Sequence, residues 1–216
     1  MSRQSQRMAR RRMSTRGDAP THPIRRLARL IATVGGLAFA VDRLLGAQSP
    51  DRRPLSGPVR VRVVIDAPIQ RVWDVLSDIP GQIRWMPEMK EVEILTPLPV
   101  GEGTIGEAYV RIFGIGVRDR VEITTFRPPH AFGIQHDGRF GGWGLIELQP
   151  GPGDRTTIVD WTEELTPPLL PHLGWVLQRP VIAHLYQRDL YLLRDLCEEG
   201  RDATTDPRAD APTPAV

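Results

Sequence analysis

Three side chains in the middle of the sequence have the chemistry needed to move a proton: Tyr109, Asp119 and His136. Each lies in a segment of alternating apolar and polar residues, a pattern typical of a strand with one buried face. A carboxyl or imidazole group that faces an apolar cavity has a shifted pKa and can act as a general acid or base. We therefore treat these three residues as candidate catalytic groups.

Asp119 has two interpretations. Period-two alternation places it on an apolar face with Val117, where it is either a carboxylate inside a pocket or a residue at the pocket edge. Three arginines, Arg111, Arg118 and Arg120, are available to pair with it at the rim. The sequence favours this rim ion pair over a buried catalytic carboxylate.

The familiar catalytic and metal-binding motifs are absent from the sequence. It contains no Gly-x-Ser-x-Gly, no phosphate-binding loop, no dinucleotide fingerprint and no pair of histidines at helical spacing. His172 and His184 are too far apart to bind one metal from a single helical turn, and a lone cysteine, Cys197, excludes both a disulfide framework and a multi-cysteine zinc site. We predict no metal and no cofactor.

The elements that must position these residues are mostly strands. An alternating segment over 59–65 precedes a short amphipathic helix that ends near Asp78 and a helical turn over 81–85. An apolar helix from about His172 to Glu199 ends the ordered region. Between them, segments bounded by Gly, Pro or Asp predict six further strands, at 92–95, 104–112, 117–126, 131–136, 142–148 and 156–165.

This order of elements predicts an α+β fold in which a curved, seven-stranded antiparallel sheet wraps around one long C-terminal helix. One helix cannot fill the space that such a sheet encloses. A cavity between the helix and the sheet is therefore expected, and apolar cavities of this kind bind apolar ligands.

The charge of the chain is divided unevenly along its 216 residues. The segment from Met1 to Arg62 carries a formal charge of +11, and the remainder carries −9. A basic arm on an acidic body predicts that the arm meets an anionic surface. Nucleic acid is a poorer partner, because the arm has no interleaved aromatic residues and the acidic body repels phosphate. A composition with 40% hydrophobic and 25% charged residues also excludes a polytopic membrane protein.

The arm contains an uncharged run, Leu30–Val41, which has three interpretations: the core of a signal peptide, a short membrane anchor or interfacial helix, and an amphipathic helix docked on the body. The anchor or interfacial helix is favoured over the other two. We predict three regions: an arm over 1–58, with disorder to about residue 26, a short apolar helix over about 27–47 and a linker; a folded domain over 59–200; and a disordered tail over 201–216.

The segment Val63–Leu95 resembles the opening of the START-like (Bet v 1-like, SRPBCC) superfamily, in its polyketide cyclase/dehydrase and lipid-transport branch. The resemblance is carried by Asp66-Ala67-Pro68, by the helix Val72–Asp78, by Arg84–Pro87 and, further on, by Arg155–Trp161. It covers 59–199 and leaves out the basic arm. It implies a helix-grip fold with two short helices after the first strand, and it implies that Trp85 lies near the pocket entrance.

Two functions from different classes follow. The first is a module that binds a hydrophobic small molecule such as a lipid, a quinone or a polyketide and that the arm would hold near a membrane. The alternative is a cyclase or dehydratase that uses His136, Asp119 or Tyr109 on a polyketide-like substrate. We favour binding over catalysis and association with a membrane over secretion or a cytoplasmic location; the sequence does not predict the oligomeric state. The predicted ligand contacts are Trp85, Tyr109, Arg111, Phe132, His136, Trp143 and Trp161.

Overall fold

The structure, a computed structural model, describes residues 22–48 and 57–202. The chain divides into two compact units, residues 1–37 and 38–216, which are described separately below. Most of the predicted arm, linker and tail, over 1–21, 49–56 and 203–216, lies outside the described residues.

The helix α1 (His22–Ala47) begins earlier than predicted, so residues 22–26 are helical where we expected disorder. Its stretch Arg25–Ala47 has 23 residues with a mean hydropathy of 1.6. At 1.5 Å per residue this stretch is about 34 Å long, enough to cross a hydrocarbon core of about 30 Å. Within the described part of the chain it is the one helix long and apolar enough to cross a membrane.

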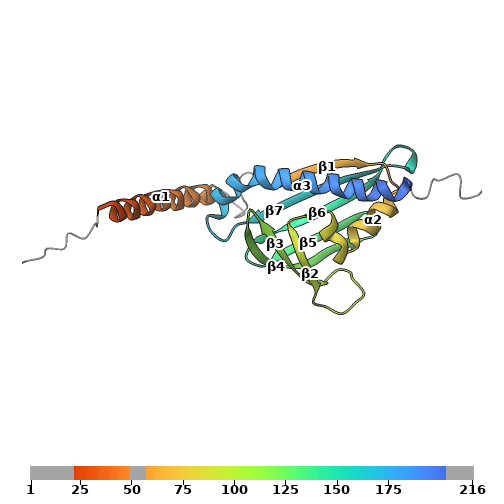
Figure 1. Ribbon diagram of the computed structural model, residues 1–216, viewed down its shortest axis with the longest axis horizontal. Helices are drawn as coiled ribbons and strands as arrows, with labels where there is room; N and C mark the ends of the chain where they lie inside the picture. Colours follow the sequence, from red (N-terminus) through yellow and green to blue (C-terminus); the bar gives the residue numbers. More distant parts are fainter. Residues whose placement is uncertain (1–21, 49–56, 203–216) are drawn as a thin grey trace, which may run out of the picture. The chain divides into compact units, whose positions relative to one another are not determined.

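The second unit, residues 38–216, which we call the body unit, is built on one seven-stranded sheet in the order β1-β7-β6-β5-β4-β3-β2, in which every neighbouring pair is antiparallel. This confirms the predicted fold class (Figure 1). In β1, burial alternates strictly from residue to residue, as the sequence pattern predicted. The strands are β1 (Val59–Ile65), β2 (Met89–Ile94), β3 (Ile105–Ile112), β4 (Ile115–Arg127), β5 (Ala131–Asp137), β6 (Gly141–Pro150) and β7 (Thr157–Thr166).

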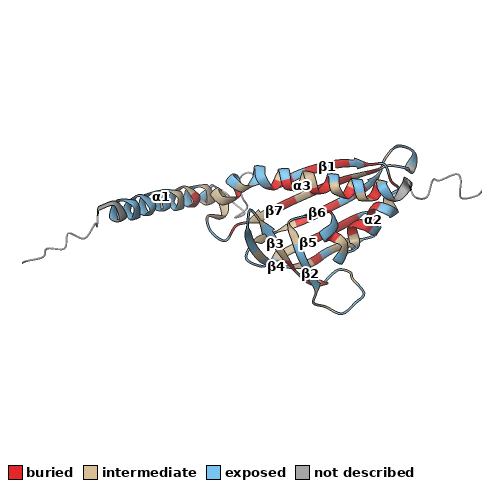
Figure 2. Ribbon diagram, in the orientation of Figure 1, coloured by how far each residue is buried: buried red, intermediate tan, exposed pale blue. Residues whose placement is uncertain are grey.

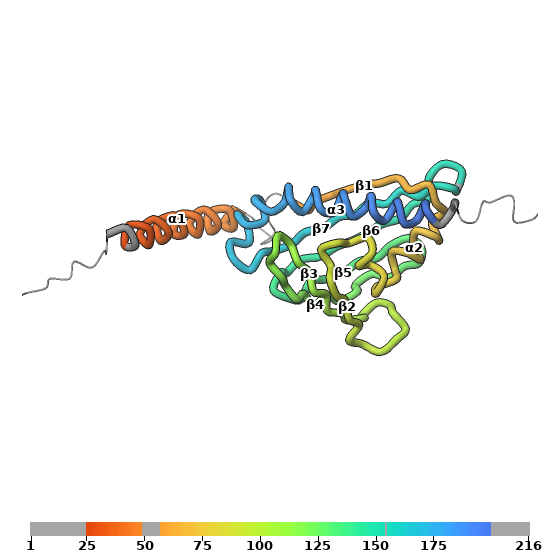
Figure 3. Tube along the Cα trace, in the orientation of Figure 1, coloured from red at the N-terminus to blue at the C-terminus, as the bar shows by residue number. Residues whose placement is uncertain are grey.

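In the described part of the chain, four helical elements interrupt or follow the strands. α2 (Ile69–Ser77) and the 3-10 helix η1 (Pro80–Arg84) form the connection between β1 and β2, and the short 3-10 helix η2 (Pro152–Asp154) connects β6 with β7. The last element, α3 (Pro171–Asp202), runs along one face of the sheet (Figures 1 and 3).

The core lies between α3, α2 and the covered face of the sheet, where the buried positions of Figure 2 gather. α3 packs mainly on β1 and on α2, and Trp175, Leu190 and Leu193 of α3 are fully buried. The same helix leaves β2 to β6 less closely covered. The helix therefore packs closely over the β1 edge of the sheet and leaves room over the other strands on the same face.

Candidate ligand-binding cavity

A cavity of about 500 Å³ lies between α3, η1 and the covered face of the sheet. Its size falls within the range of small-molecule sites, about 300–1,000 Å³. Its lining is mainly apolar, and typical wall residues are Val92, Ala108, Val121, Phe132, Ile146 and Ile182. A cavity with such walls favours an apolar ligand, because binding removes the apolar surfaces of both the ligand and the wall from water.

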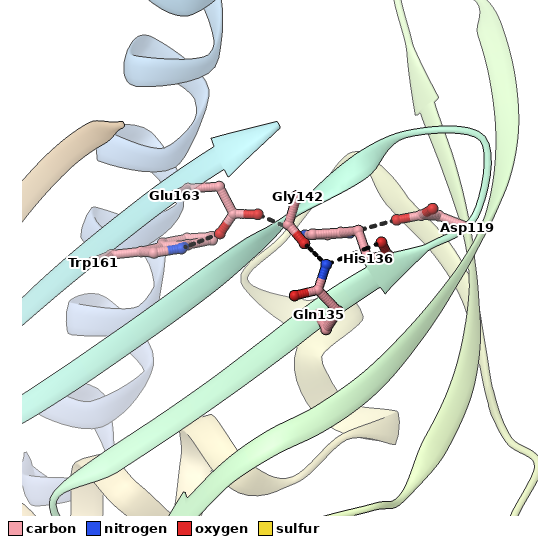
Figure 4. A network of polar contacts seen from close by, with 6 residues as sticks. All are labelled: Asp119, Gln135, His136, Gly142, Trp161 and Glu163. Carbon is pink, nitrogen blue, oxygen red and sulfur yellow. Dashed lines mark hydrogen bonds and ion pairs between the residues drawn. The ribbon is translucent and has the colours of Figure 1, made fainter. Parts of the chain in front are cut away.

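One polar network crosses the apolar wall, and it is centred on His136 of β5 (Figure 4). His136 Nδ1 lies 2.6 Å from Asp119 Oδ2 on β4, and its Nε2 lies 2.7 Å from Glu163 Oε1 on β7. The other oxygen of Glu163, Oε2, accepts a hydrogen bond of 2.8 Å from the Trp161 indole N–H. The network thus ties three strands together at the cavity surface.

The charge state of His136 follows from this geometry. Burial alone lowers the pKa of an imidazole, but the hydrogen bonds and charges of Asp119 and Glu163 outweigh burial and raise the pKa of His136 to about 10. The ring is therefore protonated at neutral pH and donates a hydrogen bond from each nitrogen. Because both N–H groups are occupied by carboxylates, His136 has no free nitrogen with which to take a proton from a substrate.

Two glycines make room for the carboxylates of this network. A Cβ on Gly144 of β6 would lie 2.2 Å from Glu163 Oε2, and a Cβ on Gly138 would lie 2.1 Å from Asp119 Oδ1. Any larger residue at either position must displace the carboxylate beside it. The absence of a side chain at 138 and 144 is therefore part of what holds the network in place.

Aromatic rings form the part of the wall next to this network. Trp161 stacks on Tyr186 of α3, with ring centroids 4.1 Å apart and an interplanar angle of 16°. Trp85, just after η1, meets Trp161 edge to face at 6.2 Å. Trp85 is buried, and no described residue accepts a hydrogen bond from its indole nitrogen. An unpaired N–H in an apolar wall gives a ligand oxygen a hydrogen-bond donor.

A second group of charges lies at the α3 side of the cavity. Arg188 forms ion pairs with Glu88 and with Asp189, and both carboxylates line the cavity. Burial raises the pKa of Asp189 to about 6, against the opposing effect of Arg188. Neither these residues nor Glu163 and Tyr186 were predicted as site residues from the sequence. A signal existed for two of them: Glu163 shares a strand face with Trp161, and Tyr186 follows Ile182 at i+4 on the apolar stripe of α3.

Of the predicted contacts, Trp85, Phe132, His136 and Trp161 line the cavity, as does the catalytic candidate Asp119. The preferred interpretation of Asp119 was wrong, because it contacts His136 instead of forming a rim ion pair. Whether any of these side chains binds a ligand stays a prediction.

Three other predicted contacts, Tyr109, Arg111 and Trp143, do not line the cavity, and that prediction is corrected. In β3 the residues that face the cavity are Gly106, Ala108, Val110 and Ile112, so Tyr109 and Arg111 lie on the opposite face. Arg118 covers the Tyr109 ring, with its guanidinium carbon 5.5 Å from the ring centroid. In β6 the cavity side is formed by Gly144 and Ile146, which places Trp143 on the far face.

Metal binding finds no support in this geometry. Asp119 and Glu163 contact opposite nitrogens of His136, so the three side chains do not converge on one point. Over residues 22–48 and 57–202, no group of three His, Cys, Asp or Glu side chains is placed to hold a metal ion.

A long helix packed along a curved antiparallel sheet, with an apolar cavity between them, defines the helix-grip class of folds. Comparison with protein families places the chain within it. Residues 57–198 match the family described as polyketide cyclase/dehydrase and lipid transport, and the chain belongs to that family. A comparison with curated proteins finds no match.

Solved structures with the same fold come from several bacteria. An aromatase/cyclase, Zhui, from a Streptomyces species is 18% identical, with a TM-score of 0.54 over 68% of this chain and 97% of that one. A conserved protein from Geobacillus kaustophilus is 18% identical (TM-score 0.53; 65% and 94%). A protein from Deinococcus radiodurans is 21% identical (TM-score 0.51; 66% and 98%). At these identities the likeness establishes the fold alone.

Proposed function

We propose that this protein binds a hydrophobic small molecule in the cavity between α3 and the sheet. The observation that carries the proposal is the cavity itself: about 500 Å³ with a mainly apolar wall. A void of this size that had no ligand to hold would sacrifice the packing contacts of every residue around it. Membership of a family that includes lipid-transport proteins agrees with this function.

The wall favours a flat or elongated ligand with few polar atoms, such as a lipid, a quinone or a polyketide-like molecule. The stacked rings of Trp161 and Tyr186 offer a flat apolar surface. The unpaired indole N–H of Trp85 supports a ligand with a carbonyl or hydroxyl oxygen at that point. These features supply shape and a hydrogen bond, which is all that a binding protein needs.

The direct test is to purify the full-length protein in mild detergent, extract bound lipids with organic solvent and identify them by mass spectrometry. A variant with a filled cavity, Ala108→Phe, should lose the extracted molecule, since Ala108 lines the cavity. Val64→Phe introduces the same ring on the exposed face of β1 and should retain it. The binding proposal fails if no molecule is enriched, or if both variants retain it equally. Unfolding curves of both variants establish that each is folded.

Catalysis by a cyclase or dehydratase is the second candidate, and the observation in its favour is the network of titratable groups at the cavity surface. The state of His136 weakens it, since an imidazolium with both N–H groups occupied cannot act as a general base. An enzyme would convert a polyketide-like substrate, and His136→Gln would abolish conversion while probe binding persisted. Probe binding without conversion in the wild type supports the binding function.

We further propose that α1 keeps the protein at a membrane. The length and hydropathy of Arg25–Ala47 support this role, and so does the basic charge that precedes the stretch. Asp42 adds a second reason: it is buried, and its Oδ1 accepts hydrogen bonds of 2.8 Å from the backbone N–H groups of His172 and Leu173. Removal of the segment by cleavage after Ala47, as in a signal peptide, would take this contact away from α3.

Fractionation of cells that express the full-length protein tests the anchor. We expect the protein in the membrane pellet after an alkaline carbonate wash, which removes proteins held by charge alone. Replacing two apolar residues of α1, Leu30→Asp and Val34→Asp, should release it into the soluble fraction. Release of the wild type by carbonate, or a soluble and shortened wild-type chain, would refute the anchor.

A further inference from the structure

The end of the body unit at which α3 begins exposes large apolar side chains around the cavity. Phe113 and Ile115 of the β3–β4 hairpin and Leu177 of α3 are 83%, 71% and 66% exposed, and all three line the cavity. Leu169, in the loop between β7 and α3, is 81% exposed. We call these four residues the mouth rim. Large apolar side chains gathered in this way mark a surface that meets an apolar partner.

The backbone at the mouth rim is strained to present these side chains. Among the described residues, two that are not glycine have a positive φ: Phe113 at 49° and Leu170 at 56°. The hairpin turn between Ile112 and Ile115 requires positive φ at both of its central positions, where asparagine, aspartate and glycine are usual. A phenylalanine there pays conformational free energy and gains no packing within the chain. A contact outside the chain would offset this cost.

Basic residues lie next to the rim. Arg111 is exposed and adjoins the β3–β4 hairpin, and Arg139 is exposed beside Phe140, which lines the cavity. Neither arginine forms an ion pair with a described residue. Apolar side chains next to unpaired arginines complement a bilayer, in which acyl chains lie beneath anionic headgroups.

The last turns of α1 are attached to this same end of the body unit. Asp42 caps the first turn of α3, and a Cβ on Gly46 would lie 2.8 Å from His172 Nε2. Asp42 lies in the last turns of the stretch Arg25–Ala47, so the 17 residues 25–41 are left to enter the bilayer, which is the lower end of the range of about 17–25 residues for a span. An anchor that ends here holds the first turns of α3, and with them Leu177, at the membrane surface.

We propose that the mouth rim inserts into a lipid bilayer that carries anionic lipid, so that the cavity opens toward the acyl chains and receives its ligand from the bilayer. This inference rests on the proposed ligand binding and on the proposed anchor. It adds the surface that docks, the orientation of the cavity and the route of the ligand.

The first test measures depth in the bilayer. Cys197 is buried, and burial raises the pKa of its thiol to about 12, so it stays unreactive at neutral pH and one introduced cysteine can be labelled alone. Full-length Phe113→Cys and Leu98→Cys, each labelled with an environment-sensitive fluorophore, are placed in phosphatidylcholine vesicles with phosphatidylglycerol. Leu98 is 73% exposed in the loop between β2 and β3, at the other end of those strands.

Spin-labelled lipid should quench the label at 113 several-fold more than the label at 98. Equal quenching at the two positions, in protein that floats with the vesicles, would overturn the proposal. So would a label at 113 that is shielded in native membranes but not in pure lipid vesicles, because the partner of the rim would then be a protein.

The second test follows transfer of a fluorescent fatty acid from vesicles into full-length protein. Leu169→Ser combined with Arg139→Gln alters the docking surface without touching the cavity wall. Transfer from vesicles should slow by at least about tenfold, since a leucine no longer enters the bilayer. Binding of the same probe delivered in detergent should not change. Leu98→Ser, the matched control, should transfer the probe at the wild-type rate.

The outcomes separate the three claims. An unchanged rate from vesicles in the double variant, with probe binding intact, overturns the mouth rim and leaves the binding function standing. Failure of the wild type to bind the probe in detergent refutes the binding function, and failure to float with vesicles refutes the anchor. Each of the last two overturns the rim as well, because each removes one of its premises.

Discussion

The raised pKa of His136 predicts how the free energy of unfolding changes with pH. Its pKa is about 10 in the folded protein, against an ordinary value of about 6.5. At 1.36 kcal/mol for each pKa unit, the difference is worth on the order of 5 kcal/mol of folding free energy. Because the pKa is raised by folding, this contribution is fully present below pH 6.5 and is lost as the pH rises toward 10.

The assay is urea unfolding of the full-length protein in detergent micelles, followed by tryptophan fluorescence at several pH values between 6.5 and 10. The wild-type free energy of unfolding should fall across this range. His136→Gln should cost about 3–5 kcal/mol at pH 6.5, because it leaves two buried carboxylates without their cation. It should also remove most of the pH dependence up to about pH 9, since Gln does not titrate; above pH 9 the thiol of Cys197, whose pKa burial raises from 9.0 to about 12, still lowers the free energy of unfolding.

The matched control is His184→Gln, which changes an exposed histidine of the same helix that carries Tyr186. Its pH profile should overlay that of the wild type. Asp189 has a pKa of about 6, so most of its titration takes place below pH 6.5 and it adds little to the change in stability between pH 6.5 and 10. The reasoning is refuted if the wild type is equally stable at pH 6.5 and pH 10, or if His136→Gln declines with pH as steeply as the wild type does.

Other predictions follow from single positions. Trp85→Phe should cost about 1–2 kcal/mol of the free energy of unfolding, because the smaller ring leaves a void in the core, and should weaken probe binding by about 1 kcal/mol in a fluorescence titration, because the indole N–H that no described residue accepts is lost; unchanged probe binding would contradict this. Gly144→Ala should destabilise the protein by about 1–3 kcal/mol in urea unfolding by displacing Glu163, whereas Gly101→Ala, where a Cβ meets open space, should be near neutral; equal effects would show that the contact is unimportant. Asp42→Ala should cost about 1–2 kcal/mol through the lost cap of α3, with Asn at the same position recovering part of it, and an unchanged unfolding midpoint would exclude the cap.

Secondary structure and topology were predictable because they depend on periodicity. The alternation over 59–65 became β1, the segments between turn residues became the other six strands, and the apolar stripe from about His172 became α3. The family match over 57–198 agrees with the resemblance carried by the motifs of the first helix. These properties are local, so each segment specifies its own element and the elements leave few ways to pair.

The sequence predicts which residues of a strand share a face, but not which of the two faces is covered by the helix. Alternation puts Tyr109 and Arg111 on the same face of β3, but it does not state which face turns toward the helix. In β3 the face that turns toward the helix is set by pairing with β2 and β4. This pairing places Ala108 on the cavity side and Tyr109 on the opposite face. Trp143 was misplaced for the same reason, because a one-residue change of parity exchanges the two faces.

The sequence by itself determined the α+β fold, the order of its elements, the cavity that one helix must leave, and the contrast between basic arm and acidic body. Only the tertiary structure decided that Asp119 meets His136, that Glu163 completes the network from β7, and that glycines at 138 and 144 leave space for both carboxylates. It also decided that Asp42 of α1 caps α3, 130 residues later in the chain. The physical reason is separation: contacts between residues tens of positions apart form through the register and packing of whole elements, and no local pattern encodes them.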